Sequence, residues 1–156
     1  GFVILYSVHM IVEAEIESLV SNNKQLKAQV DLLNSINGIG NKTAWAIIAY
    51  MGDIALFDNA KQVTAFAGLN PKITQSGTSV NKTSLSKVGH KKLRKSLYMP
   101  ALVAVRYNPL MLDLYERLQQ KGKPKKVALC AVMRKLLVIS YGVLKSGRPF
   151  DVNYAK

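Results

Sequence analysis

The stretch LLNSINGIGNKTAWAIIAYMG, residues 32–52, decides the fold. An apolar helical run ends just before Gly38 and Gly40, and a second apolar run begins at about Asn41. Glycine permits the tight backbone of an interhelical turn, and Gly52 is a typical residue to end the second run. The stretch therefore predicts two helices joined by a short hairpin.

This hairpin also has the chemistry of a phosphate site. Its glycines let a ligand approach the backbone, and the helix that follows begins with free N–H groups beside the charge of Lys42. Helix-hairpin-helix modules grip the DNA backbone in this way without reading sequence. The alternative is an ordinary tight turn, since such turns often contain glycine. The candidate nucleic-acid contacts here are Gly38, Gly40, Lys42 and Thr43.

Upstream of the hairpin, apolar residues recur at alternating spacings of three and four, which predicts one long helix over residues 1–34. A lone Asn23 at an a position is typical of a two-stranded coiled coil. We therefore expect residues 1–34 to mediate self-association and residues 35–150 to form the second domain. The alternative is an amphipathic helix that packs on its own domain. The seam consists of Phe2, Leu5, His9, Val12, Ile16, Leu19, Asn23, Leu26, Val30 and Leu33.

Downstream, turn and cap residues delimit further helices, and Pro100 is expected to interrupt one of them. Residues 72–84 are polar and predict a loop or a short β-hairpin. The predicted fold class is therefore all-α, a helical domain that contains a helix-hairpin-helix. The expected helices run from about Asn41 to Met51, Asn59 to Ala67, Lys91 onward, Asn108–Pro109 to Gln120, and Pro124 to Lys145.

The net charge of +13 is unevenly distributed. Residues 1–60 carry a net charge of −3 and residues 61–156 a net charge of +16, with no acid between Asp58 and Asp113. A polyanionic partner is the simplest reason for a chain to tolerate such self-repulsion, and nucleic acid is the commonest one. A solvated basic surface, a ribosomal-type protein and a membrane-surface protein are the alternatives.

A second motif, SKVGHKKLRK at residues 86–95, predicts a glycine turn that leads into a basic helix. Lys91, Arg94 and Lys95 would share one face, while Leu93 and Leu97 face the core. Basic residues in a first turn oppose the helix dipole, which favours phosphate contact over a purely structural role. The candidate nucleic-acid contacts are Lys82, Lys87, Gly89, His90, Lys91, Lys92, Arg94 and Lys95, and a second basic cluster consists of Lys121, Lys123, Lys125 and Lys126.

Composition limits the other function classes. The one cysteine and two histidines form no ligand cluster, so we expect neither a metal site nor a cofactor in this chain. Cys130 lies in an apolar run and is interpreted as a core residue in a reducing cytoplasm. Residues 127–144 are apolar, but Arg134 and Lys135 at their centre argue against a membrane span.

The order of these pieces resembles the C-terminal domain of a family of insertion-sequence transposases that also includes pilin-gene DNA invertases. The resemblance covers about residues 26–146 and rests on LLNSINGIGNKTAWAIIAYMGDIALFDNAKQVTAFAGLNPKITQSG, SKVGHKKLRKSLYMPA and GKPKKVALCAVMRKLL. It implies DNA as the partner and, for some members, a guide RNA. It also implies an N-terminal RuvC-like domain whose Asp-Glu-Asp-Asp site holds a divalent metal such as Mg²⁺, followed by a coiled coil.

The resemblance further implies that Ser76, next to Gly77, is the catalytic serine that attacks DNA. By the residues alone Ser76 is a turn residue, because no Ser-His-Asp arrangement activates it. Ser79, Ser84 and Ser86 are nearby competitors.

Two departures from the family pattern concern local geometry: His90 stands where an Asn is common, and Pro100 interrupts a helix. The RuvC-like acids are not found among the nine acids of this chain, so we expect it to be inactive by itself. The alternative functions are a non-catalytic helix-hairpin-helix module that binds DNA or RNA, and a basic RNA-binding or assembly protein.

Overall fold

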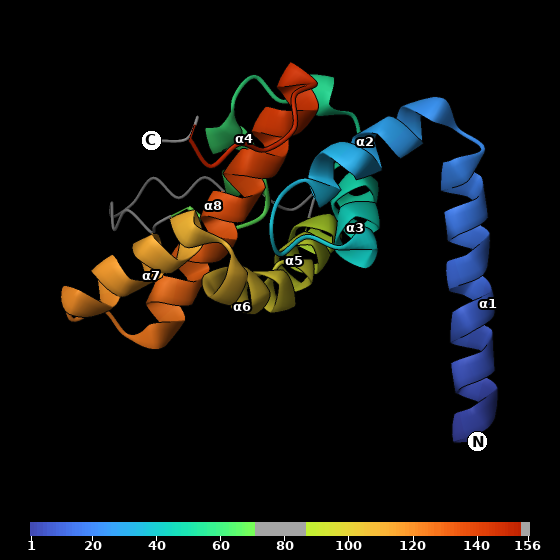
Figure 1. The fold of residues 1–156 in the computed structure, drawn as a ribbon, viewed down its shortest axis with the longest axis horizontal. Coiled ribbons are helices and arrows are strands. Elements are labelled where there is room, and N and C mark those ends of the chain that lie inside the picture. Colours follow the sequence, from blue (N-terminus) through green and yellow to red (C-terminus); the bar gives the residue numbers. More distant parts are fainter. Residues whose placement is uncertain (71–86, 154–156) are drawn as a thin grey trace.

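The computed structural model describes residues 1–70 and 87–153, and for residues 87–90 it describes the backbone alone. These residues form helices and no strand, which confirms the all-α prediction; the loop or β-hairpin predicted near 72–84 lies outside them. The elements are α1 (Phe2–Ser21), α2 (Lys24–Asn34), α3 (Asn41–Met51), the 3-10 helix η1 (Ile54–Leu56), α4 (Ala60–Phe66), α5 (Lys87–Ser96), α6 (Tyr98–Tyr107), α7 (Pro109–Gln120) and α8 (Lys125–Ser146) (Figure 1).

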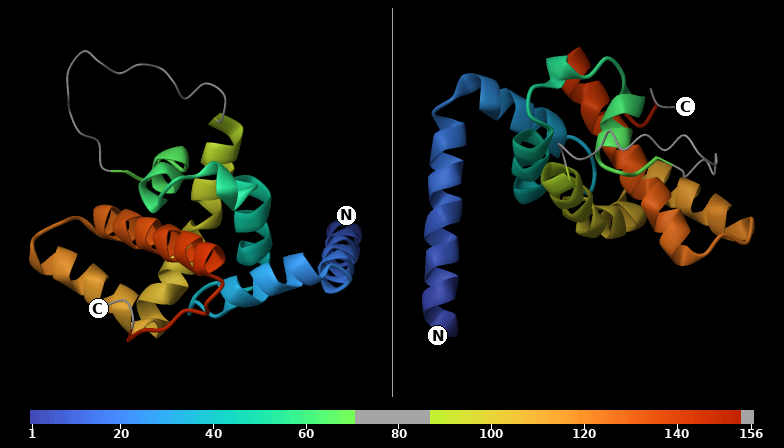
Figure 2. Two further views of the ribbon diagram at one scale, coloured as in Figure 1. Left: turned by 90° about the horizontal axis from the view of Figure 1, so that it is seen from above. Right: turned by 180° about the vertical axis from the view of Figure 1, so that it is seen from behind.

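Helix α8 is the central element of the fold. It packs against α2, α4, α6 and α7, and it crosses the middle of the helical body (Figures 1 and 2). Val132, Leu136 and Leu137 on its inner face are fully buried. By length and composition alone α8 could cross a membrane. Its buried face explains that apolar composition, because the core of the helical domain is built around it.

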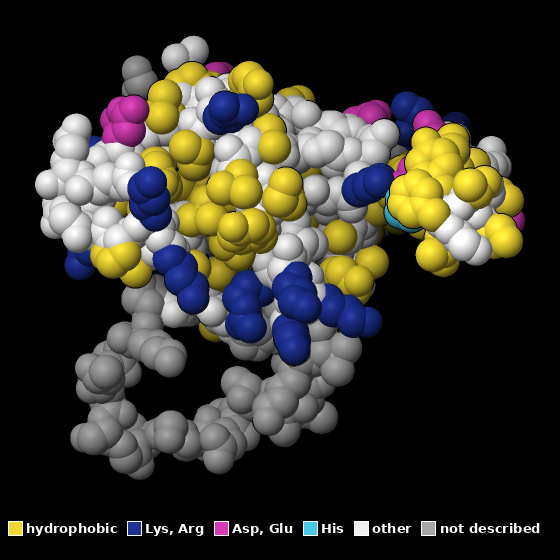
Figure 3. Space-filling model, turned by 90° about the horizontal axis from the view of Figure 1, so that it is seen from below, with side chains coloured by type: hydrophobic (Ala, Val, Ile, Leu, Met, Phe, Trp, Pro, Cys, Tyr) yellow, Lys and Arg dark blue, Asp and Glu magenta, His cyan; other side chains and the backbone are white. Residues whose placement is uncertain are grey.

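The N-terminal segment is two helices instead of the single helix predicted over 1–34. The Asn23 side chain accepts hydrogen bonds from the backbone N–H groups of Gln25 (3.1 Å) and Leu26 (3.2 Å) and so caps α2. Asparagine is a strong N-cap and a weak interior helix former, so it ends one helix and begins the next. Helix α1 stands away from the body and shows hydrophobic side chains on its surface (Figures 1 and 3).

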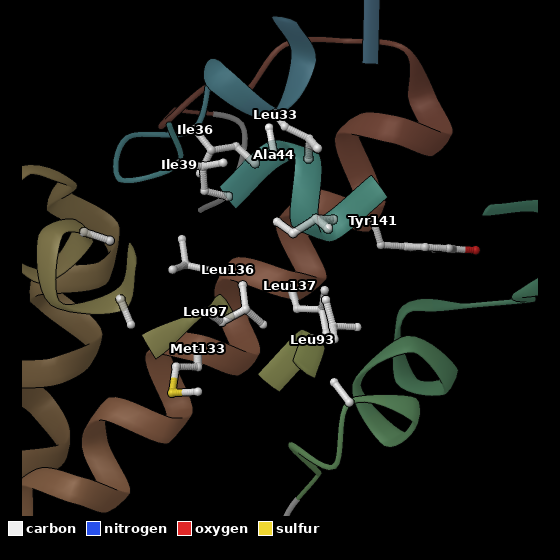
Figure 4. Packing of buried hydrophobic residues seen from close by; sticks show 14 of the residues in the cluster. Leu33, Ile36, Ile39, Ala44, Leu93, Leu97, Met133, Leu136, Leu137 and Tyr141 are labelled. Atoms are coloured by element: carbon white, nitrogen blue, oxygen red, sulfur yellow. The ribbon is translucent and has the colours of Figure 1, made fainter. Parts of the chain in front are cut away.

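The hairpin between α2 and α3 belongs to the core. Leu33, Ile36, Ile39 and Ala44 come from this hairpin and its flanking helices, and they pack toward side chains of α5 and α8 (Figure 4). All four are 4% exposed or less. The predicted turn is therefore held by burial on both of its sides as well as by its glycines.

Most of the predicted helix ends are confirmed. They were predictable because capping residues close in the sequence determine them. Helix α3 has the predicted bounds, Asn59 caps α4 through the N–H of Gln62 (3.0 Å), and Asn108 caps α7 with Pro109 at its first position. Helix α8 ends at Ser146, and its C-cap Gly147 has a φ of 70° in the left-handed region.

Three local predictions are wrong. Helix α5 begins at Lys87, so Gly89 lies within the helix and not in a turn before it. The interruption expected at Pro100 falls at Leu97, and Pro100 occupies the first turn of α6, where the missing N–H costs no hydrogen bond. Cys130 is exposed and is not a core residue, because it lies on the outer face of α8.

Candidate nucleic-acid interface

Gly38 of the hairpin packs directly against α6. Its φ is +111°, and a Cβ built on it would lie 2.8 Å from the Cβ of Ala104 and 3.1 Å from the Pro100 carbonyl oxygen. The Asn108 amide donates to the Asn37 carbonyl (3.3 Å) and the Asn37 amide donates to the Tyr107 carbonyl (3.4 Å). Gly38 is therefore needed for close packing against α6. The sequence alone could not distinguish this role from contact with a phosphate.

Gly40 faces open space and is the N-cap of α3. Its neighbour Lys42 does not face solvent as a free charge, since its Nζ lies 2.6 Å from Oε1 of Glu13 and 3.3 Å from Nε2 of His9 in α1. The hydrogen bond from Lys42 lowers the pKa of Glu13 below its ordinary value. Thr43 is half-buried. Among the candidate contacts of the hairpin, Gly40 is therefore the one that is open to a ligand. The charge of Lys42 is paired with a carboxylate.

Helix α5 presents its lysines to solvent. Lys91, Lys92 and Lys95 are exposed and Arg94 is half-buried, while Leu93 and Leu97 are fully buried as predicted. Arg94 and Lys95 lie in the last turn of α5. The helix dipole favours cations there, so for these two residues the sequence argument from an unfavourable dipole is wrong. Lys87, Gly89 and His90 belong to the first turn of α5, and their side chains are outside the described residues.

The second basic cluster surrounds the turn between α7 and α8. Lys121, Lys123, Lys125 and Lys126 are all exposed. Seen from below, a row of Lys and Arg side chains borders an apolar area at the centre of the molecule (Figure 3). Within residues 1–70 and 91–153, no carboxylate lies within 4.0 Å of these lysines or of the exposed lysines of α5.

Two features were missed by the sequence reasoning. Arg134 is half-buried on α8, and its Nε is shielded from solvent without a hydrogen-bond partner among the described residues. A depression of about 480 Å³ lies between α6, α7 and α8, and two lysines and two tyrosines contribute to its walls. The position of Arg134 within an apolar helical run was a signal that the sequence offered. The depression is formed by three helices, so no local sequence pattern indicates it.

Ser76 and Lys82 lie outside the described residues, so their predicted roles stay predictions. No group of three or more His, Cys, Asp or Glu side chains that could hold a metal ion occurs in the described part of the chain.

Known proteins resemble this chain over most of its length. The family described as Transposase IS116/IS110/IS902 matches residues 30–116, more than half of the chain. The pilin gene-inverting protein of Moraxella lacunata is 41% identical over 140 residues, or 88% of this chain. The chain belongs to the IS116/IS110/IS902 transposase family. The family match includes the α2–α3 hairpin and the basic helix α5.

Two further relatives are similar to this chain. The pilin gene-inverting protein of Moraxella bovis is also 41% identical over 88% of this chain. The insertion element IS110 uncharacterized 43.6 kDa protein of Streptomyces coelicolor is 26% identical over 77% of this chain. The chain spans 43% of the length of the Moraxella proteins and 30% of the Streptomyces protein.

Proposed function

We propose that this chain is the DNA-binding part of a transposase or DNA invertase and that it holds DNA phosphates on its exposed lysines. The observation that supports this proposal is that Lys91, Lys92 and Lys95 on α5 and the four lysines of the α7–α8 turn face solvent, with no carboxylate within 4.0 Å of them in the described structure. When lysines without a carboxylate partner contact a polyanion, they neutralise its phosphates and release the counterions that were condensed on it. The family membership supports DNA as that polyanion.

The open end of the hairpin adds a neutral contact. Gly40 leaves room for a phosphate at the start of α3, whereas Lys42 must first leave Glu13 if it is to take part. We assign the hairpin a weaker role than α5, since its single lysine is already paired.

Ser76 is the proposed nucleophile. Its Oγ would lose a proton and form a bond to a DNA phosphorus, while the bond from that phosphorus to the leaving deoxyribose oxygen breaks and that oxygen takes up a proton. The lysines of α5, a short distance along the chain, would offset the charge that develops on the phosphate. A divalent metal is expected in a RuvC-like domain. The described residues of this chain offer no ligand group for it.

Self-association is proposed through α1. Leu5, Val12 and Leu19 lie on this helix and are 72%, 48% and 68% exposed. Val30 and Leu33, which the predicted seam also contained, are buried in the core and cannot take part. The proposed interface is therefore confined to residues 2–21, about the length of three heptads.

The binding proposal is tested by the salt dependence of duplex DNA binding, measured by fluorescence anisotropy. Each phosphate contact contributes about −0.9 to the slope of log K against log salt. We expect the double variant Lys91→Ala, Lys92→Ala to flatten the slope by about 1 to 2 units. Lys27→Ala is the matched control, because Lys27 pairs with Asp31 on α2 (3.5 Å). An unchanged slope in the double variant contradicts the proposal, and equal binding of duplex RNA favours the RNA-binding alternative.

The serine is tested separately, in the protein extended to the length of its relatives and supplied with the ends of its element. Ser76→Ala should retain DNA binding and lose the covalent protein–DNA adduct on a denaturing gel. Ser79→Ala, three residues away, is the control. An adduct that survives Ser76→Ala removes this residue from the mechanism.

A further inference from the structure

The depression between α6, α7 and α8 is an aromatic pocket with a basic edge. Its volume of about 480 Å³ falls within the range of small-ligand pockets, roughly 300–1,000 Å³. Tyr98 is 51% exposed and Leu102 is 40% exposed, so its walls face solvent and are not sealed within the core. The pocket is lined by Tyr98, Leu102, Val105, Tyr115, Lys125, Lys126 and Leu129.

The charges of this pocket suit a nucleic acid better than an apolar protein segment. Lys125 and Lys126 stand at its edge, and its lining holds no carboxylate. Neither lysine and neither tyrosine hydroxyl has a hydrogen-bond or ion-pair partner among the described residues. Aromatic faces beside lysines are the elements by which proteins hold unpaired nucleotides, with bases stacked on the rings and phosphates on the cations.

We propose that this pocket receives one unpaired base of a DNA strand, stacked on Tyr98 or Tyr115, while the phosphates beside that base lie against Lys125 and Lys126. The proposal rests on the proposed DNA-binding function and names the form of DNA that this site takes. A base inside a duplex has no free face, so the pocket can act only where pairing is interrupted. Strand exchange in a transposase or an invertase creates such interruptions.

The charges around the pocket are compatible with the same occupant. One face of the molecule carries a row of Lys and Arg side chains beside an apolar area (Figure 3). Asp113 of α7 is paired with Arg117 (3.2 Å) and does not line the pocket. Glu116, next to Tyr115, does not line the pocket.

The test compares a paired DNA duplex with the same duplex carrying a single bulged 2-aminopurine. We expect the chain to bind the bulged duplex about tenfold more tightly, in line with the measured contribution of one base–aromatic stack. We also expect the bound 2-aminopurine to be protected from acrylamide quenching. Tyr98→Leu and Tyr115→Leu should each reduce the preference and the protection, since leucine keeps apolar bulk without an aromatic face.

Tyr107→Leu is the matched control. Tyr107 is 66% exposed on the same α6 but does not line the pocket, so its loss should leave both readouts unchanged. Far-UV circular dichroism checks that each variant is folded. If a tyrosine variant does not fold, Lys125→Gln replaces it, and a smaller preference for the bulged duplex is then expected.

The outcomes separate the two proposals. Binding of paired DNA with no preference for the bulge and no acrylamide protection overturns the pocket assignment and leaves the DNA-binding function intact. Loss of binding to every DNA means that the proposed function itself fails. Tighter binding to the same bulged sequence made as RNA, or an effect of Tyr107→Leu as large as that of Tyr115→Leu, overturns the assignment of a DNA base to this site.

Discussion

Gly38 and Ala104 are in direct contact across the α2–α3 hairpin and α6. A Cβ on Gly38 would lie only 2.8 Å from the Ala104 Cβ, closer than real Cβ atoms approach, and the backbone of Ala104 leaves no flexible group to move. This contact packs the hairpin against α6, one of the three helices that line the aromatic pocket.

Gly38→Ala is therefore expected to destabilise the fold by about 2–4 kcal/mol, through overpacking and through the strain of a φ of +111° for a residue with a Cβ. Chemical denaturation measures the change. Gly40→Ala is the control two residues away, because nothing lies within 4 Å of its Cβ position and its φ is −91°. Its expected cost is below about 1 kcal/mol. Equal costs for the two substitutions would contradict this account.

Asn23→Ala is expected to lower the stability of the α1–α2 junction by about 1 kcal/mol, because Asn23 caps α2 through two backbone N–H groups. Hydrogen exchange at Gln25 and Leu26 measures the local loss. Asn22→Ala is the matched control, since the Asn22 side chain is exposed and makes no hydrogen bond in the described structure. If exchange became faster after Asn22→Ala and did not change after Asn23→Ala, the assignment of Asn23 as the cap of α2 would be wrong.

The fold was predictable where local chemistry decides it. The caps at Asn59 and Asn108–Pro109 were correctly predicted because a cap needs only residues two or three positions away. Asn23 was predicted to occupy a coiled-coil a position, but in the structure it caps α2. The periodicity alone does not reveal that Val30 and Leu33 are buried in the core.

The candidate site was predictable only in part. The exposed lysines follow from charge, and the exposure of Lys91, Lys92 and Lys95 is confirmed. The pairing of Lys42 with Glu13 joins residues 29 positions apart, and the aromatic pocket joins three helices. Such features depend on tertiary packing, so neither composition nor spacing could indicate them.

The contact between α1 and α3 is expected to depend on pH. The hydrogen bond from Lys42 lowers the pKa of Glu13, so the contribution of this pair is present above the ordinary pKa of a glutamate and is lost as the pH falls through the lowered value. Glu13→Gln should reproduce the acidic state at neutral pH. NMR shifts of Lys42 and Ala44 measure the change. Glu17→Gln on the same helix is the control, and an equal response in both variants would contradict a specific contact.

Arg134→Met is expected to separate stability from binding. Arg134 is half-buried, and its shielded Nε has no partner among the described residues, so methionine should leave stability unchanged or raise it by about 1 kcal/mol. Arg134 as a whole is only half-buried, so part of its side chain remains open to a phosphate. We therefore expect the same variant to bind DNA about tenfold more weakly. Lys135→Met, the adjacent half-buried cation, is the control for charge. Denaturation and anisotropy give the two readouts. A variant that loses several kcal/mol of stability while binding DNA normally would show that Arg134 serves the fold and not the ligand.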